Sequence, residues 1–256
     1  MKKRSPIKEK PLRYPGESLD REILRLQDEM LYKYGLYAAF FFALAILEWL
    51  RYATNAQPNP WVYSFAALVV ISFTTYKIMQ IRQRVKQLEL GRDGERAVGE
   101  FLEELRAKGY VIFHDIVGEG FNIDHVVFAP SGVYAIETKT RSKPAKGTAN
   151  IIYDGKKVLI DGFELERDPL IQSKSQAKWL RGILHESTGK MFPVQPVILF
   201  PGWYVENKIP QSTASVWVLN PKALPSFIEG SASKVSESDL HMASFHLSRY
   251  IRSQPF

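Results

Sequence analysis

Two apolar runs in the first third of the chain constrain the fold most. Residues 34–50 (YGLYAAFFFALAILEWL) and 61–76 (WVYSFAALVVISFTTY) are almost wholly apolar, and a short polar loop separates them. A bilayer span needs about 17–25 residues, and a helix of a soluble protein normally has a polar face, which these runs lack. We therefore expect two transmembrane helices, at about 34–50 and 61–79, within a hairpin over 34–81. Two buried helices of a soluble bundle are the alternative.

The charges beside these runs predict their orientation. Both outer flanks are rich in Lys and Arg, whereas the connecting loop carries only Arg51. The positive-inside rule then places both termini in the cytoplasm, in a multi-pass protein of the plasma (inner) membrane. The basic flanks are also suited to contact the anionic headgroups of the lipid bilayer.

The net charge of +7 is unevenly distributed. Residues 1–33 carry nine Lys/Arg and six Asp/Glu, 77–92 carry five and one, and 93–256 carry nineteen of each. The basic excess therefore flanks the apolar runs and is absent from the main domain. The chain has no cysteine, which excludes disulfides, thiol nucleophiles and Cys-ligated metals. Its five histidines show no paired metal-binding spacing such as HExxH.

The remaining pattern predicts a mixed α/β domain over 93–256. A tail and a short helix, capped by Ser18 and ending near Tyr32, fill 1–33, and 82–92 is a linker helix. We expect Gly91–Gly94 to interrupt the helix, and a new helix to run to about Lys108. Strands are then expected at 110–116, 122–129, 133–139, 194–200 and 214–219, with a hairpin over 151–165 that turns at 154–155. Helices are expected over 168–185, 221–228 and 238–252.

The stretch 122–139 (NIDHVVFAPSGVYAIETK) carries the candidate chemistry. Pro130-Ser131-Gly132 is typical of a turn between two strands. Since side chains two apart share a face of a strand, antiparallel pairing brings Asp124 beside Glu137 and Lys139. Carboxylate oxygens suit Mg²⁺ or Mn²⁺, and a lysine there can orient water or neutralise phosphate. A solvated face with a surface ion pair is the structural alternative.

Two helices add further polar candidates. Glu95 lies on the same stripe as the apolar Val98 and Leu102, so it is either near a wet helix end or placed for a purpose. Asp168-Pro169 begins another helix, with Asp168 as its N-cap. Gln172 and Gln176 extend that helix's apolar face, either at its wet end or toward the site.

These residues, in this order and spacing, resemble the NERD (nuclease-related domain) family over about 91–205. The resemblance is carried by Gly94-Glu95 with Val98, Asn122-Ile123-Asp124-His125, Gly132-Val133, Glu137-Thr138-Lys139, and Asp168-Pro169-Leu170 with Gln172. One departure is Asp168, where the family often has Asn. Nothing after about 205 matches the family pattern, so no role is assigned there.

The resemblance implies an α/β, restriction-endonuclease-like PD-(D/E)xK core (helix, three strands, helix, strand) behind the two-helix transmembrane hairpin. It further implies that Asp124 and Glu137 bind Mg²⁺ (or Mn²⁺), that Lys139 assists the attacking water, and that Glu95 and Gln172 are accessory catalytic residues. The expected function is a membrane-anchored, metal-dependent nuclease acting on DNA or RNA at the cytoplasmic side. An inactive nucleic-acid-binding or scaffold domain is one alternative, and a hairpin that assembles with membrane partners is another.

Overall fold

The computed structural model describes residues 12–56, 60–143, 150–164, 168–232 and 235–254. The chain forms two compact units, one from Met1–Glu17 with Gly91–Phe256 and one from Ser18–Leu90. The helical unit is thus an insertion between two segments of the α/β unit. The tail predicted over 1–33 is divided between the two units.

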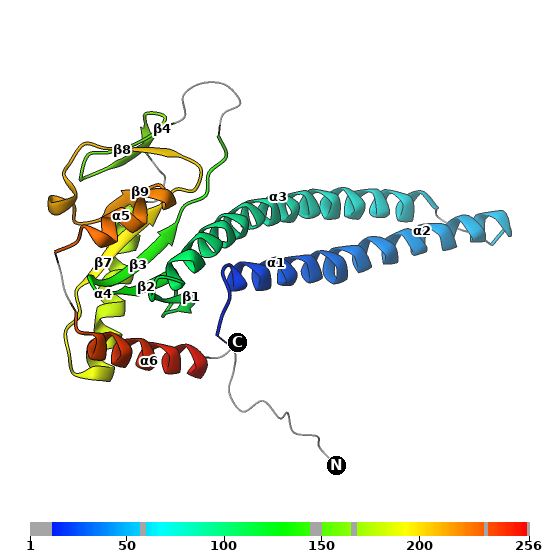
Figure 1. Cartoon of the computed structure of the whole chain (residues 1–256). Coiled ribbons are helices and arrows are strands. Elements are labelled where there is room, and N and C mark those ends of the chain that lie inside the picture. Colours follow the sequence, from blue (N-terminus) through cyan, green and yellow to red (C-terminus); the bar gives the residue numbers. More distant parts are fainter. Residues whose placement is uncertain (1–11, 57–59, 144–149, 165–167, 233–234, 255–256) are drawn as a thin grey trace, which may run out of the picture. The chain divides into compact units, whose positions relative to one another are not determined.

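The helical unit consists of two long helical segments (Figure 1). The first is continuous through α1 (Glu17–Glu29), a π-helical stretch η1 (Met30–Gly35) and α2 (Leu36–Ala53). The second is the start of α3 (Pro60–Arg106). The predicted Ser18 cap is wrong, because α1 already includes Glu17, whose Oε2 accepts a hydrogen bond from the backbone N–H of Tyr14 (3.3 Å). No break separates the first helix from the apolar run, because Gly35 keeps right-handed helical dihedrals.

The apolar runs lie on helices long enough to cross a bilayer, which by itself is a weak indication of a span. None of the apolar window of Glu17–Ala53, and 11% of that in Pro60–Arg106, is buried. Two helices buried in a soluble bundle would bury these windows. Near the turn between the helices, Trp49 Nε1 donates to Ser64 Oγ (3.2 Å), and Glu48 accepts from Arg51 Nη1 (3.0 Å).

The predicted interruption of the helix at Gly91–Gly94 is wrong, since α3 runs unbroken from Pro60 to Arg106. These glycines serve close packing. A Cβ on Gly94 would lie 1.6 Å from Thr140 Oγ1, and one on Gly99 would lie 2.3 Å from Pro15 Cγ. A helix without side chains at these positions lets neighbouring chain approach its backbone.

The α/β unit is built on a five-stranded mixed sheet with the order β1-β2-β3-β7-β9. Its strands are β1 (Val111–Val117), β2 (Asn122–Ala129), β3 (Gly132–Thr138), β7 (Val194–Leu199) and β9 (Trp217–Leu219). The first three strands pair antiparallel, whereas β3, β7 and β9 are parallel. The expected order of helix, three strands, helix and strand is confirmed.

Helices cover both faces of this sheet (Figure 1). One core packs α4 (Pro169–Thr188) and α6 (Glu237–Ser253) on residues such as Val126 and Ala135. The other packs the end of α3 and α5 (Leu224–Glu229) on residues such as Val127 and Ile136. The strands β2 and β3 therefore alternate between the two cores, as buried strands must.

A second sheet, of order β6-β5-β4-β8, packs on the first through a third core, in which Ile151 and Tyr153 meet Ile198 and Val218 (Figure 1). It contains β4 (Asn150–Tyr153), β5 (Val158–Ile160), β6 (Phe163–Glu164) and β8 (Tyr204–Asn207). The hairpin predicted at Asp154-Gly155 is confirmed: Asp154 Oδ1 accepts from the backbone N–H groups of Lys156 and Lys157. The strand β8 was not predicted. Two short 3₁₀ turns, η2 (Gln211–Thr213) and η3 (Pro221–Ala223), flank β9.

Candidate active site at the end of strand β3

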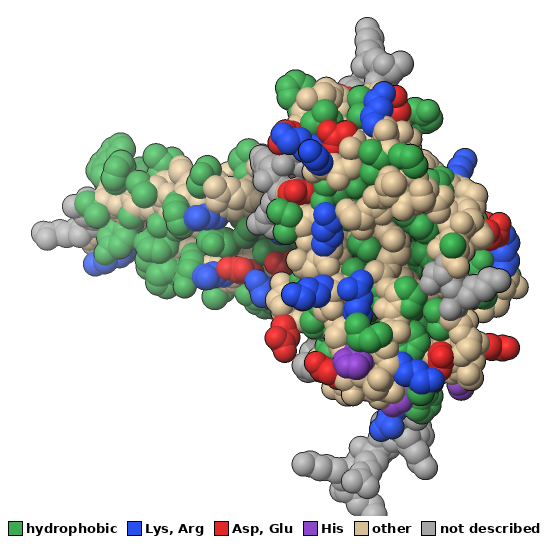
Figure 2. All heavy atoms as spheres, turned by 90° about the vertical axis from the view of Figure 1, so that its left-hand side faces the viewer, with side chains coloured by type: hydrophobic (Ala, Val, Ile, Leu, Met, Phe, Trp, Pro, Cys, Tyr) green, Lys and Arg blue, Asp and Glu red, His purple; other side chains and the backbone are tan. Residues whose placement is uncertain are grey.

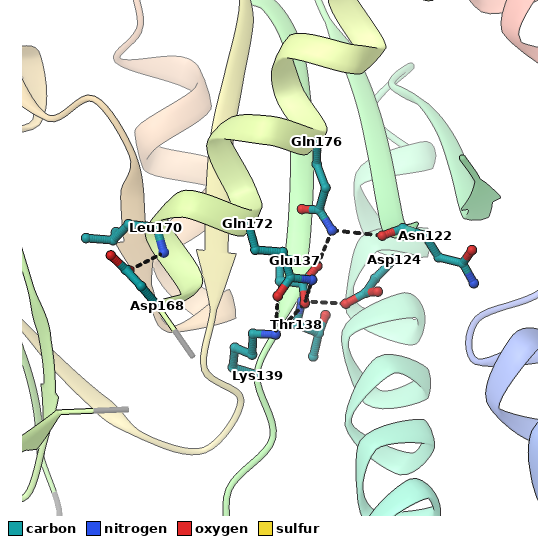
Figure 3. A network of polar contacts seen from close by, with 9 residues as sticks. All are labelled: Asn122, Asp124, Glu137, Thr138, Lys139, Asp168, Leu170, Gln172 and Gln176. Atoms are coloured by element: carbon teal, nitrogen blue, oxygen red, sulfur yellow. Dashed lines mark hydrogen bonds and ion pairs between the residues drawn. The ribbon is translucent and has the colours of Figure 1, made fainter. Parts of the chain in front are cut away.

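Strand register brings the two candidate carboxylates together. His125 pairs with Ile136, which sets Asp124 opposite Glu137 one step further along the antiparallel pair. Asp124 Oδ2 accepts a hydrogen bond from the backbone N–H of Thr138 (2.7 Å), so its side chain is directed at the neighbouring strand (Figure 3). The alternation of β2 and β3 places both residues on the side that α4 covers.

Glu137 is the centre of the polar network in Figure 3. Its Oε1 accepts from Lys139 Nζ (2.6 Å) and from Gln172 Nε2 (2.8 Å), and its Oε2 accepts from Gln176 Nε2 (2.5 Å). Gln172 Oε1 in turn accepts from Lys139 Nζ (3.0 Å). Three side chains from two elements therefore hold one buried carboxylate in a fixed orientation.

Helix α4 places Gln172 and Gln176 beside Glu137, and its first turn is fixed by a cap. Asp168 Oδ1 accepts from the backbone N–H of Leu170 (2.8 Å), which is an N-cap, and Pro169 occupies the first turn. Asp therefore performs the capping expected of Asn at this position. Gln172 and Gln176 are one turn apart on the same helix face, and Gln176 Nε2 also donates to the carbonyl oxygen of Asn122 (2.8 Å).

Glu95 reaches the same region from helix α3. It is buried, and burial raises its pKa to about 8, with further contributions from the charges of Asp115 and Glu137. A backbone hydrogen bond from Gly16 and the charge of Lys139 act in the opposite direction. Its electrostatic interaction with Glu137 and Lys139 agrees with the expectation that Glu95 lies beside the site.

Burial also raises the pKa of Asp124 well above its usual value, and the charges of Glu137 and Glu95 add to the effect. The Thr138 amide and Lys139 oppose it. Clustered carboxylates that share little compensating charge resist ionisation. A bound cation would relieve this repulsion, because it supplies the opposite charge directly.

Two further residues beside this cluster were missed from the sequence. Asp115 Oδ2 accepts from Arg13 Nη1 (3.1 Å), and Asp115 Oδ1 accepts from Asn122 Nδ2 (3.2 Å). The side chains of Arg13 and Asp115 are only 5% and 2% exposed. Asp115 adopts a positive φ of 50°, and both Phe113 and Ile116 then face the same core. The only sequence feature that singles out Asp115 is an acidic residue within a predicted strand. No sequence feature places Arg13 near the candidate site.

The side chains here that suit a metal ion are those of Asp124 and Glu137, because carboxylate oxygens are the hard ligands that Mg²⁺ prefers. Within the described residues, no group of three or more His, Asp or Glu side chains is arranged to hold a metal ion. Among the described residues, Gln176 Oε1 is a buried polar atom without a partner, and the amide that carries it donates to Glu137 through Nε2. Such atoms are normally satisfied by water or a ligand, so this side of Glu137 suits a hydrated cation.

Comparison with known proteins agrees with this geometry. The family described as "Nuclease-related domain" (NERD) matches residues 90–201, close to the 91–205 expected from the sequence. An uncharacterized protein of Bacillus anthracis is 25% identical over 128 residues, which are 47% of this chain and 49% of that protein. The alignment thus spans about half of that relative's length. No solved structure matches the chain.

The match covers the part of α3 that carries Glu95, the strands that carry Asp124 and Glu137, Lys139 directly after β3, the helix that carries Gln172, and strand β7. Residues 90–201 of this chain are therefore a nuclease-related domain of the NERD family, with a restriction-endonuclease-like fold.

Proposed function

We propose that this protein is a membrane-anchored, metal-dependent nuclease whose active site is formed by Asp124, Glu137 and Lys139. The observation that carries the proposal is the Lys139 ammonium 2.6 Å from the Glu137 carboxylate, with Asp124 opposite on the next strand. Two carboxylates and a lysine in this arrangement match what phosphodiester hydrolysis requires: a place for a divalent cation and a positive charge near the scissile phosphate.

Each residue has a role that follows from its contacts. Asp124 and Glu137 would hold Mg²⁺ or Mn²⁺, which when bound lowers the pKa of water and neutralises charge on phosphate. Lys139, paired with Glu137 and Gln172, would present its ammonium to the attacking water or to the phosphate. Gln172 and Gln176 orient the Glu137 carboxylate by donating to both of its oxygens. Glu95 would be an accessory acid.

The membrane part of the proposal rests on the helical unit. Its apolar windows are exposed, and a bilayer is the environment that stabilises such surfaces. Basic residues flank the hairpin at both ends, which favours a cytoplasmic location for both termini and places the substrate, DNA or RNA, on that side. The basic flanks would contact anionic headgroups. The plasma (inner) membrane is the proposed location, with 34–81 as the anchor and 93–256 as the nuclease domain.

The test is a cleavage assay on the full chain in detergent, with labelled single-stranded and duplex DNA and RNA. Cleavage should require Mg²⁺ or Mn²⁺, stop with EDTA, and be lost in Glu137→Gln and Lys139→Met. The matched control is Lys157→Met, which removes an exposed lysine paired with Glu164 on the second sheet. Intact substrate at high enzyme concentration across both metals would contradict the proposal.

A non-catalytic nucleic-acid-binding or scaffold domain is the second candidate. Two observations favour it: 93–256 carries nineteen basic and nineteen acidic residues, and no three-residue metal cluster occurs among the described residues. Under this alternative, Asp124→Ala would leave the cellular role intact. Loss of that role in a folded Asp124→Ala protein would reject it.

A further inference from the structure

A cavity of about 750 Å³ lies at the carboxyl ends of strands β7 and β9. Its walls come from Pro201–Val205, Asn207 and Leu219–Ala223, with Ala97 and Phe101 of α3, Lys143 and Phe227. All these residues belong to the α/β unit. The volume is within the range of small-molecule and cofactor pockets, and none of the residues assigned to the proposed active site lines it.

The cavity and the proposed active site share one edge of the sheet. Strands β3, β7 and β9 are parallel neighbours, so the end of β3, which carries Glu137, and the ends of β7 and β9 lie side by side. The backbone N–H of Lys139 donates to the carbonyl oxygen of Leu199 (2.8 Å), which joins the two ends directly. The two lie on different sides of this edge: Phe101, Leu219 and Phe227 in the cavity wall belong to the core under α3 and α5, whereas Glu137 accepts from Gln172 of α4.

The cavity combines an exposed aromatic ring with cationic side chains. Tyr204 is 70% exposed, so its side chain is accessible to a ligand in the cavity. Lys143 and Lys222 are exposed, and the Lys143 ammonium lies 5.7 Å from the centroid of the Trp203 ring. Trp203 is itself buried, and its Nε1 donates to the carbonyl oxygen of Arg141 (3.1 Å), which fixes the loop that leads from Lys139 to Lys143.

The polar side chain of Asn220, also in the wall, is committed to the fold. Its Nδ2 donates to the carbonyl oxygen of Trp203 (2.7 Å), and its Oδ1 accepts from the backbone N–H of Lys222 (3.0 Å). It is therefore not available to read the edge of a base. Stacking on an aromatic ring tolerates any base, because every base has a π-face.

Figure 2 shows how the charged side chains are distributed on one face of the molecule. Lys and Arg side chains there are interspersed with acidic and hydrophobic ones and form no continuous basic patch. Non-specific binding of duplex depends mainly on phosphate contacts, which such a face supplies poorly. An unpaired strand offers base faces as well as phosphates.

We propose that this cavity binds an unpaired nucleobase of a strand that crosses the sheet edge from the scissile phosphate, with Tyr204 as its stacking platform and Lys143 and Lys222 contacting the adjoining phosphates. The inference rests on the proposed nuclease function and deepens it, because it makes single-stranded nucleic acid the substrate class. A base within a duplex is already stacked on both faces and would not reach Tyr204 without unpairing.

The experiment separates binding from cleavage by using the full chain with Glu137→Gln in detergent. Fluorescence anisotropy with a single-stranded oligonucleotide, and with the same strand in a duplex, gives both dissociation constants. Tyr204→Ala should weaken single-strand binding roughly 10-fold and change duplex binding little. The matched control is Phe163→Ala, which removes a 78% exposed ring on β6 that does not line the cavity.

The lysines are tested by salt dependence. Lys143→Ala with Lys222→Ala should reduce the slope of log affinity against log salt by about 2, and Lys156→Ala with Lys157→Ala serves as the control. Equal binding of single strand and duplex, or a Tyr204→Ala protein that binds single strands like its parent, overturns the inference. A Tyr204 effect on binding without metal-dependent cleavage in the parent protein would instead reject the nuclease and retain the cavity as a binding site.

Discussion

Arg13 and Asp115 lie 102 positions apart and form a buried ion pair of 3.1 Å. The pair attaches the segment before the helical unit to strand β1. Close by, Gly16 lies against Arg92, to whose Cγ an added Cβ would be 3.0 Å. The chain therefore leaves the α/β unit and returns to it at adjacent points, and residues 13–17 are part of the domain that carries the proposed active site.

The first prediction concerns this pair. Arg13→Met removes the Arg13 guanidinium from the buried Asp115 carboxylate, and such a change typically costs about 3–5 kcal/mol. Asp115→Asn in the Arg13→Met background removes the carboxylate charge and should restore much of the loss. Chemical unfolding followed by tryptophan fluorescence measures both. The control, Lys108→Met, breaks an exposed pair with Glu229 (3.5 Å) and should change stability by less than about 1 kcal/mol. Equal losses of stability in Arg13→Met and Lys108→Met would show that the Arg13–Asp115 pair contributes no more than an exposed pair.

The second prediction is a pH dependence set by Glu95. Its pKa is about 8 in the folded protein against 4.5 as the reference for an unperturbed side chain. Between these values the folded state binds more protons than the unfolded state, so the contribution of Glu95 to stability falls as pH rises from 4.5 to 8. The wild type should lose up to about 5 kcal/mol over this window relative to Glu95→Gln, at 1.36 kcal/mol per pKa unit.

Unfolding at pH 5 and pH 8 in EDTA measures this difference. The substituted protein should gain stability relative to the wild type at pH 8, and the two should converge at pH 5. If the free energies of unfolding of the two proteins differ by the same amount at pH 5 and pH 8, Glu95 ionises normally and the prediction is wrong.

The third prediction tests the glycine packing of α3. Gly94→Ala places a Cβ 1.6 Å from Thr140 Oγ1, so the helix and the strand end must separate. We expect a loss of about 1–3 kcal/mol or more. Gly182→Ala is the control, because Gly182 lies in α4 with no atom within 4 Å of its added Cβ, and it should stabilise the protein by about 0.4–1 kcal/mol. Thermal unfolding distinguishes the two, and a neutral Gly94→Ala would show that the close approach is absent.

Much of the site could be predicted from the sequence because local signals determine it. The turn residues between β2 and β3 set the register, the register sets Asp124 opposite Glu137, and the cap at Asp168 sets the helix that presents Gln172. Arg13 and Asp115 could not be paired, since no local pattern reports a contact across 102 positions. The sequence predicts a helix break at Gly94, because glycine is typical both of breaks and of positions where another segment packs closely on a helix. Only the position of Thr140 in the folded protein shows that the second reason applies.

The fourth prediction concerns Lys139 and Gln172 in the proposed reaction. Lys139→Met should lower the single-turnover cleavage rate by about 10²–10³-fold, the size of effect found when one group that stabilises transition-state charge is removed. Gln172→Ala should have a smaller effect, because Glu137 still accepts from Lys139 and Gln176. Oligonucleotide dissociation constants should stay near wild type in both. A Gln172→Ala rate as low as that of Lys139→Met would show that the amide acts on substrate directly.

The most direct test of the central claim is a crystal of the protein soaked in Mn²⁺ and measured at an anomalous wavelength. We expect a peak bound by carboxylate oxygens of both Asp124 and Glu137, at about 2.0–2.3 Å from each. The peak should disappear in Asp124→Asn. A crystal with no peak between these two carboxylates, and with Lys139 still paired to Glu137, would contradict the assignment of a metal-dependent nuclease site.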